Sequence, residues 1–141
     1  MEIVKAPNPI LNTVCEEVDL NIVDNHNLAF EMIDTLIQSG GLGLAAPQVG
    51  YGLRMFIMRY GMEYIICVNP EITRRGRDKV KDIEGCLSIP GKRIMVERSK
   101  ICELEYTELS GKRIKLKLRG LDARCAQHEM DHLNGVLITE K

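Results

Sequence analysis

The segment His128-Glu129-Met130-Asp131-His132 carries the side chains best suited to metal chemistry in this chain. In a helix, residues four apart lie about 6 Å apart along the axis and about 40° apart around it, so both imidazoles can reach one cation. Glu129 is turned by about 100° from His128, which suits a base acting on a water bound to that cation. The alternative interpretation is that the two histidines and Glu129 only form a polar, solvent-facing side of a helix. Because two of only three histidines fall at ligand spacing, a metal site is favoured.

A catalytic metal also needs a third protein ligand and an open fourth position. No histidine and only one carboxylate follow His132, so the third ligand is expected upstream. One candidate is Cys86, beside a glycine that permits close backbone approach. The other is Cys125, three residues before His128 on the same helical face. If both cysteines bound, the result would be a closed Cys₂His₂ structural zinc site, and the spacing leaves that possibility open.

A glycine-rich segment, Gly41-Leu42-Gly43-Leu44-Ala45-Ala46-Pro47-Gln48, is the third unusual stretch. Its first six residues fit the dinucleotide-binding pattern G-x-G-x-x-A. A helix is expected before it, however, where that fingerprint needs a strand, and Pro47 interrupts the helix that should follow. The pattern alone therefore indicates only a turn that leads into a strand.

Hydrophobic periodicity predicts the elements that position these segments. Apolar residues at helical spacing predict a helix over 24–39, capped by Asp24 and ended by Gly40-Gly41, and another over 121–134 followed by Gly135. Short β-branched and apolar runs predict strands at 53–60, 64–68, 93–98, 100–106 and 112–118. Strands grouped between helices indicate an α+β fold, with antiparallel sheets packed around the helix that carries the histidines. Residues 1–23 look irregular.

Composition bounds the remaining possibilities. The 141 residues, 45% hydrophobic and 28% charged, are expected to form one domain over 1–141. A net charge of −1 gives no electrostatic reason to expect a nucleic acid or membrane partner. No apolar run approaches the roughly 20 residues that span a bilayer, and the start lacks a secretory signal pattern. The five cysteines are therefore expected to be reduced thiols in the cytoplasm, as in a bacterial cytosol.

Taken together, the three segments 41–48, 84–88 and 127–133 closely resemble the signature motifs of the peptide deformylase family, in that family's order and with similar separations. The resemblance extends over essentially the whole chain, from Pro7 to Gly135. It implies a metal-dependent amidase that removes the formyl group, as formate, from the N-terminal formyl-methionine of newly synthesised polypeptides. It also implies one divalent metal ion, Fe(II) in the cell, with zinc, nickel or cobalt as substitutes.

The resemblance makes Cys86, His128 and His132 the metal ligands. It makes Glu129 the general acid/base, with metal-bound water as the nucleophile. This agrees with the physical reasoning, because a thiolate and two imidazoles leave a position for water and lower its pKa.

The same resemblance assigns the substrate contacts. Gln48 and the backbone N–H of Leu87 become the donors to the developing oxyanion. Gly43 would let the peptide backbone approach closely and add to a sheet edge. The methionine pocket is expected to be lined by Leu42, Leu121 and Cys125. Nascent formyl-methionyl peptides are the implied partners, with the ribosome surface as a further one, and the chain is expected to be a monomer.

Charged neighbours of the motifs support three further expectations. The resemblance suggests that Glu84 pairs with Arg98 and braces the loop that holds Cys86. The alternative interpretation is that both are ordinary surface charges that contribute little to stability. Asp131 is a candidate for orienting an imidazole or capping a neighbour, as an alternative to a solvated acid. Arg124 is expected to face solvent rather than to lay its stem against the methionine pocket.

Two other function classes remain open at this stage. A non-catalytic metal-binding module would use Cys125 as a fourth ligand. A general zinc endopeptidase would share Glu129 and the water but cleave internal peptide bonds.

Overall fold

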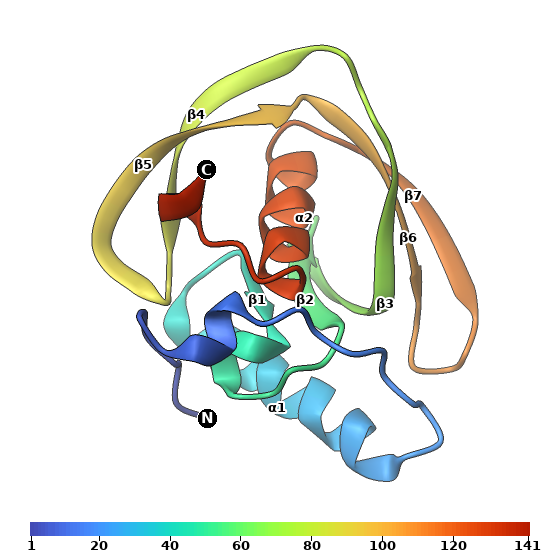
Figure 1. Ribbon diagram of the computed structural model, residues 1–141. Helices are drawn as coiled ribbons and strands as arrows, with labels where there is room; N and C mark the ends of the chain where they lie inside the picture. The colour runs from blue at the N-terminus through green and yellow to red at the C-terminus, as the bar shows by residue number, and fades with distance from the viewer.

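The computed structural model describes residues 1–141 and has the α+β fold with antiparallel sheets that the sequence predicts (Figure 1). Its two α-helices are α1 (Val23–Ser39) and α2 (Gly120–Leu133). The strands are β1 (Gly43–Ala45), β2 (Met55–Tyr60), β3 (Glu63–Arg75), β4 (Lys79–Cys86), β5 (Ile89–Ser99), β6 (Ile101–Thr107) and β7 (Arg113–Arg119). Short 3₁₀ helices span Pro9–Asn12, Ala46–Val49 and Ile138–Glu140.

The strands form two sheets on either side of α2. One has five strands in the order β1-β2-β3-β6-β7, and the other is the two-stranded hairpin β4–β5. In Figure 1 the hairpin curves past one side of α2, while β3, β6 and β7 lie on its other side. Consequently α2, which carries residues 128–132, faces both sheets.

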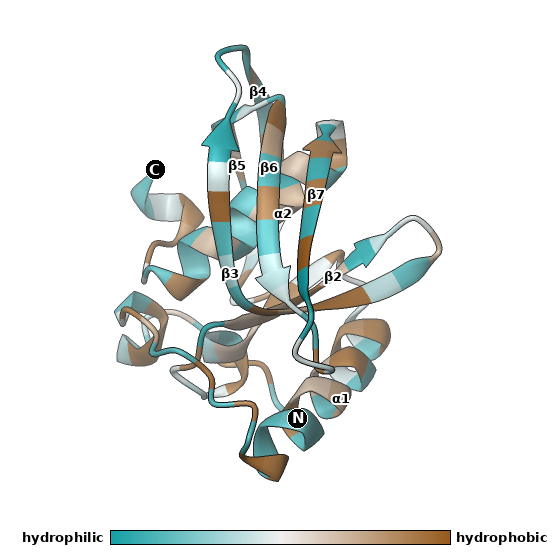
Figure 2. Ribbon diagram, turned by 90° about the vertical axis from the view of Figure 1, so that its right-hand side faces the viewer, coloured by the Kyte–Doolittle hydropathy of each residue, from teal (hydrophilic) through white to brown (hydrophobic).

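Apolar packing on both faces holds the five-stranded sheet between the helices. One cluster joins Phe56 and Met58 of β2 to Ala123 and Ala126 of α2, whose small side chains allow a close approach. Another cluster joins the alternate β2 residues to α1, with members that include Met55, Ile57, Leu28, Met32 and Leu36. Figure 2 shows the matching alternation of hydrophobic and hydrophilic residues along β6 and β7. Full burial of each large apolar side chain of this kind stabilises the folded state by roughly 1.5–3 kcal/mol relative to leaving that side chain exposed.

Most predicted elements are present with shifted ends, but β4 and the short β1 lie where no strand was predicted. The expected cap of α1 is also wrong: Ile22 is the N-cap residue and gives no side-chain hydrogen bond, while Asp24 lies in the first turn. Its charge still favours the helix dipole there. Gly40, at φ +72°, ends α1 as expected, and Gly135, at φ +76°, follows α2.

All five cysteines are free thiols in the structure, and three of them are buried in the core. Neither α-helix combines the length and the apolar character that a membrane crossing requires.

Candidate metal centre and substrate cavity

One thiol and two imidazoles converge between the end of β4 and α2. The Cys86 Sγ lies 3.4 Å from His132 Nε2, which in turn lies 3.2 Å from His128 Nε2. All three ligand atoms lie within 4.8 Å of one another. The helix supplies two of them one turn apart, and the hairpin supplies the third across a tertiary contact.

These three donors fit a divalent metal ion. Tetrahedral bonds of about 2.0–2.1 Å to nitrogen and 2.3 Å to sulfur place neighbouring donors roughly 3.3–3.6 Å apart, close to the spacing observed here. Because the His128 Nδ1 faces the Glu84 carboxylate at 2.8 Å, its Nε2 points toward the other two donors. A set of one sulfur and two nitrogens suits zinc, iron, nickel or cobalt rather than magnesium or calcium.

The second cysteine candidate, Cys125, lies outside this group of donors. Its sulfur instead lies beside β1, 3.0 Å from where a Cβ on Gly43 would be. Burial raises the pKa of the Cys125 thiol well above its ordinary value. The geometry therefore assembles three protein donors and not a closed Cys₂His₂ site.

The Glu84 carboxylate receives four hydrogen bonds behind the metal centre. Its Oε1 accepts from Arg98 Nη2 at 2.9 Å and from His128, while its Oε2 accepts from Arg98 Nε at 2.9 Å and Arg124 Nη1 at 2.6 Å. Burial alone would raise the pKa of Glu84, but the hydrogen bonds from His128 and Arg98 outweigh it and hold the pKa well below its usual range. The expected pairing of Glu84 with Arg98 is thus confirmed.

One expectation about a neighbouring charge is wrong, and another is wrong in part. Arg124 does not face solvent: it is 9% exposed, and it donates to Glu84 and to the backbone carbonyls of Val96 and Val80. The reason is that β4 and β5 cover this side of α2. Asp131 accepts from Arg98 Nη1 at 2.5 Å and orients no imidazole directly.

The two imidazoles respond differently to burial. Burial and the neighbouring His128 lower the pKa of His132 to about 3, so this ring is neutral, which is the ligating form. At His128 burial acts in the same direction, but hydrogen bonds with Cys86 and Glu84 outweigh it and raise the pKa to about 10. A cation bound at His128 therefore takes the place of a proton.

The Glu129 carboxyl group is buried against β1, and its Oε1 has no hydrogen-bond partner. Burial raises the pKa of Glu129 to about 7, which suits a group that must both accept and donate a proton. A Cβ on Gly43 would lie 2.6 Å from Glu129 Oε2, so only glycine leaves room for this carboxyl group. Gly43 therefore leaves space for the Glu129 carboxyl group, in addition to the close approach of a substrate backbone expected from the sequence.

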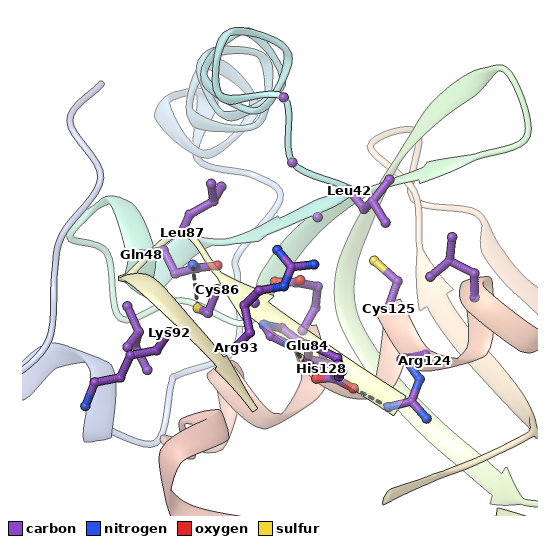
Figure 3. Close-up of a pocket in the computed structure, with 18 of the residues that line it drawn as sticks. Leu42, Gln48, Glu84, Cys86, Leu87, Lys92, Arg93, Arg124, Cys125 and His128 are labelled. Carbon is purple, nitrogen blue, oxygen red and sulfur yellow. Dashed lines mark hydrogen bonds and ion pairs between the residues drawn. The ribbon is translucent and has the colours of Figure 1, made fainter. Parts of the chain in front are cut away.

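The Gln48 side chain is buried and its amide has one defined orientation. Its Oε1 accepts from the Ala45 N–H at 3.0 Å, so its Nε2 faces Ser88 Oγ at 3.2 Å. The same Nε2 lies 3.7 Å from Cys86 Sγ (Figure 3). The backbone N–H of Leu87 donates to no other backbone group. Two donors thus lie next to Cys86.

A cavity of about 610 Å³ opens beside these groups (Figure 3). Its lining includes Gln48, Cys86, His128 and Glu129. It also includes the residues expected to contact substrate, Leu42, Gly43, Leu121 and Cys125. Sequence reasoning missed further lining residues for which no motif gave a signal: Ile83 of β4 and, at the start of β5, Ile89, Gly91, Lys92 and Arg93.

Comparison with known proteins places this chain in a family of hydrolases. The family model for polypeptide deformylase matches residues 1–141. The peptide deformylase of Dictyoglomus thermophilum is 40% identical over 140 residues, covering 99% of this chain and 91% of that protein. Peptide deformylase 1 of Bacillus anthracis is 41% identical over 146 residues, covering 100% of this chain and 91% of that protein.

Solved structures agree with the sequence relatives. The peptide deformylase of Thermotoga maritima has a TM-score of 0.96 at 36% identity, covering 99% of this chain and 95% of its own. A Met-Ala-Ser-bound peptide deformylase of Acinetobacter baumannii has a TM-score of 0.93 at 34% identity, covering 99% of this chain and 96% of its own. The chain belongs to the polypeptide deformylase family. It is an enzyme of that type, which removes N-formyl groups from nascent peptides.

Proposed function

We propose that this chain hydrolyses the formamide of N-terminal formyl-methionine in newly synthesised polypeptides, using a divalent metal held by Cys86, His128 and His132. The observation that carries the proposal is the convergence of these three donors beside a cavity that also presents an acid and two oxyanion donors. A bound metal, Fe(II) with zinc, nickel or cobalt as substitutes, would supply a Lewis acid and lower the pKa of a water molecule.

Glu129 performs the proton transfers in this proposal. Its carboxylate accepts a proton from the attacking water and passes a proton to the methionine nitrogen as the formyl C–N bond breaks, which releases formate and a free amine. With a pKa of about 7, the group exchanges protons readily in either direction near neutral pH. The Glu129 Oε1 has no hydrogen-bond partner within the protein, so no other residue competes for its lone pairs.

Gln48 and Leu87 stabilise the negative charge that develops on the formyl oxygen. The hydrogen bond from Ala45 to Gln48 Oε1 holds the amide so that its Nε2 donates toward the site. The free N–H of Leu87 is a second donor that needs no reorganisation during the reaction.

The substrate backbone is proposed to lie along β1. This strand pairs with β2 on one side only, so its other edge offers N–H and C=O groups to an extended peptide. Leu42, Leu121 and Cys125 line the same cavity and provide an apolar wall for the methionine side chain.

A comparison of three substrates tests this function. The metal-loaded protein is incubated with formyl-Met-Ala-Ser, its acetylated counterpart and casein, while formate and new amino groups are measured. We expect formate release from the first substrate and little reaction with the others. Cleavage of casein would indicate an endopeptidase, and equal turnover of the acetyl peptide would overturn the assignment to formyl groups.

A further inference from the structure

Arg124 is the one charged side chain of α2 that reaches both strands of the β4–β5 hairpin. Its Nη1 donates to the Val96 carbonyl of β5 at 2.9 Å and to Glu84 Oε2 of β4 at 2.6 Å. Its Nη2 donates to the Val80 carbonyl of β4 at 2.7 Å. The Arg124 guanidinium therefore links both strands to the helix through hydrogen bonds.

The position of Arg124 in the chain links these contacts to the metal ligands. Arg124 lies one helical turn before His128, on the same face of α2. Its partner Glu84 lies two residues before Cys86 and also accepts from the His128 Nδ1. Movement of this one carboxylate would therefore disturb a ligand on the helix and a ligand on the hairpin together.

Arg98, the other guanidinium on Glu84, has a different position in the fold. It belongs to β5, so its two hydrogen bonds with Glu84 lie within the hairpin and do not by themselves place the hairpin against α2. Its link to the helix runs through Asp131, on the far side of His128 from Arg124. Arg124 and Arg98 thus hold the hairpin at two separate points along the helix.

The Glu84 carboxylate offers about four lone-pair positions, and all of them are occupied by donors. Without Arg124, Glu84 Oε2 would keep only its hydrogen bond from Arg98 Nε, and the carboxylate could rotate about its remaining partners. The hydrogen bond that orients the His128 ring would then be less well fixed, since charge-assisted hydrogen bonds depend on geometry.

We propose that Arg124 is a positioning residue for the metal centre, which sets the His128 ring through Glu84 and the Cys86 sulfur through the β4–β5 hairpin. The inference rests on the proposed metal site. Arg124 does not touch the metal; it keeps the helix donors and the hairpin donor at the separation that one ion requires.

Metal affinity tests this role without relying on enzyme activity. We would measure Zn²⁺ and Co²⁺ dissociation constants by chelator competition for the wild-type chain, Arg124→Met and Arg124→Lys, and record the cobalt d–d and sulfur-to-cobalt charge-transfer bands. We expect Arg124→Met to weaken binding by about 10–100-fold and to change the cobalt spectrum. Arg124→Lys should give an intermediate affinity, because a single ammonium cannot span Glu84 and both carbonyls.

Two controls separate positioning from general stability. Arg119→Met removes an exposed arginine next to the start of α2 and should leave both readouts unchanged. Met32→Ala opens a cavity in the α1 core and should lower the melting temperature without changing the metal dissociation constant. If Arg124→Met fails to fold, Arg124→Lys carries the test alone.

The outcomes distinguish this inference from the proposed function. Wild-type affinity and an unchanged cobalt spectrum in both Arg124 variants, with only a lower melting temperature, would overturn the positioning role. Failure of the wild-type chain to bind either ion would instead overturn the proposed metal site, whatever the variants do.

Discussion

Strands β2 and β4 are held in the molecule by different forces. Residues 55–58 of β2 are apolar and fully buried, and they pack against both helices. In β4 the single buried residue is an acid, Glu84, while apolar Val80 and Ile83 are exposed. The sheet is therefore fixed by burial of apolar surface, whereas the β4–β5 hairpin is fixed to α2 largely by buried ion pairs and hydrogen bonds.

The difference matters because the candidate metal centre spans both regions. Apolar packing is non-directional and sets how far α2 lies from the sheet. Charge-assisted hydrogen bonds set orientation as well, and orientation is what Cys86 needs to reach the two imidazoles. Burying such charges is unfavourable unless all are paired, which accounts for the full set of donors around Glu84.

Glu129→Gln gives the largest expected effect and tests the sheet side of the comparison. Apolar packing of α2 and the space left by Gly43 position this carboxyl group without any ion pair. Since only proton transfer is removed, kcat should fall by about 10²–10⁴-fold while metal content is retained. Steady-state kinetics and elemental analysis on the same preparation check this. Wild-type kcat in the metal-replete variant would exclude the proposed acid/base role.

Glu84→Gln tests the hairpin side. The change leaves two buried guanidiniums with less compensating charge, so the free energy of unfolding should fall by about 3–5 kcal/mol. Metal affinity should fall with it, by about 10–100-fold, because the His128 ring loses its carboxylate partner. Urea denaturation of the metal-free chain and chelator competition measure the two quantities.

The comparison becomes sharper with two matched variants. Asp82→Asn removes an exposed acid from the same strand and should change the free energy of unfolding by less than about 0.5 kcal/mol. Met32→Ala should lower stability by about 2–5 kcal/mol without affecting the metal. If Met32→Ala weakened metal binding as much as Glu84→Gln did, the contrast between the two regions would not hold.

Gln48→Leu has an intermediate expected effect, at the junction of the two regions. Loss of one oxyanion donor costs on the order of 3 kcal/mol, or about a hundredfold in kcat, with KM nearly unchanged. Because Gln48 also accepts from Ala45, the melting temperature should drop as well. Metal content, melting temperature and kcat are therefore measured together. A folded, metal-replete variant with unchanged kcat would show that Gln48 only anchors the turn.

Cys125→Ala should have the smallest effect on the metal. The Cys125 sulfur lies beside β1 and outside the donor group, so metal content and affinity should stay within about twofold of the wild type. Cys86→Ala, compared side by side, should empty or severely weaken the site. Elemental analysis that showed the reverse would move the third ligand to the helix and favour a structural metal site.

The local spacing of His128, Glu129 and His132 was enough to predict their positions relative to one another, because a helix has a fixed pitch that a sequence pattern reveals. Alternating and β-branched runs likewise indicated the antiparallel strands. The choice between Cys86 and Cys125 was different. The residues alone left it open, the family resemblance favoured Cys86, and the tertiary contact between hairpin and helix brings that sulfur to the imidazoles.

The environment of Arg124 and the existence of β4 were decided only by the tertiary structure. Residues 79–86 are mostly polar and exposed, so no hydrophobic period marks them as a strand. Without that strand, Arg124 has no visible partner and looks like a solvated charge. Apolar periodicity can be recognised within a short stretch of sequence. The buried ion pair of Arg124 with Glu84, in contrast, joins residues 40 positions apart and becomes apparent only when the chain is folded.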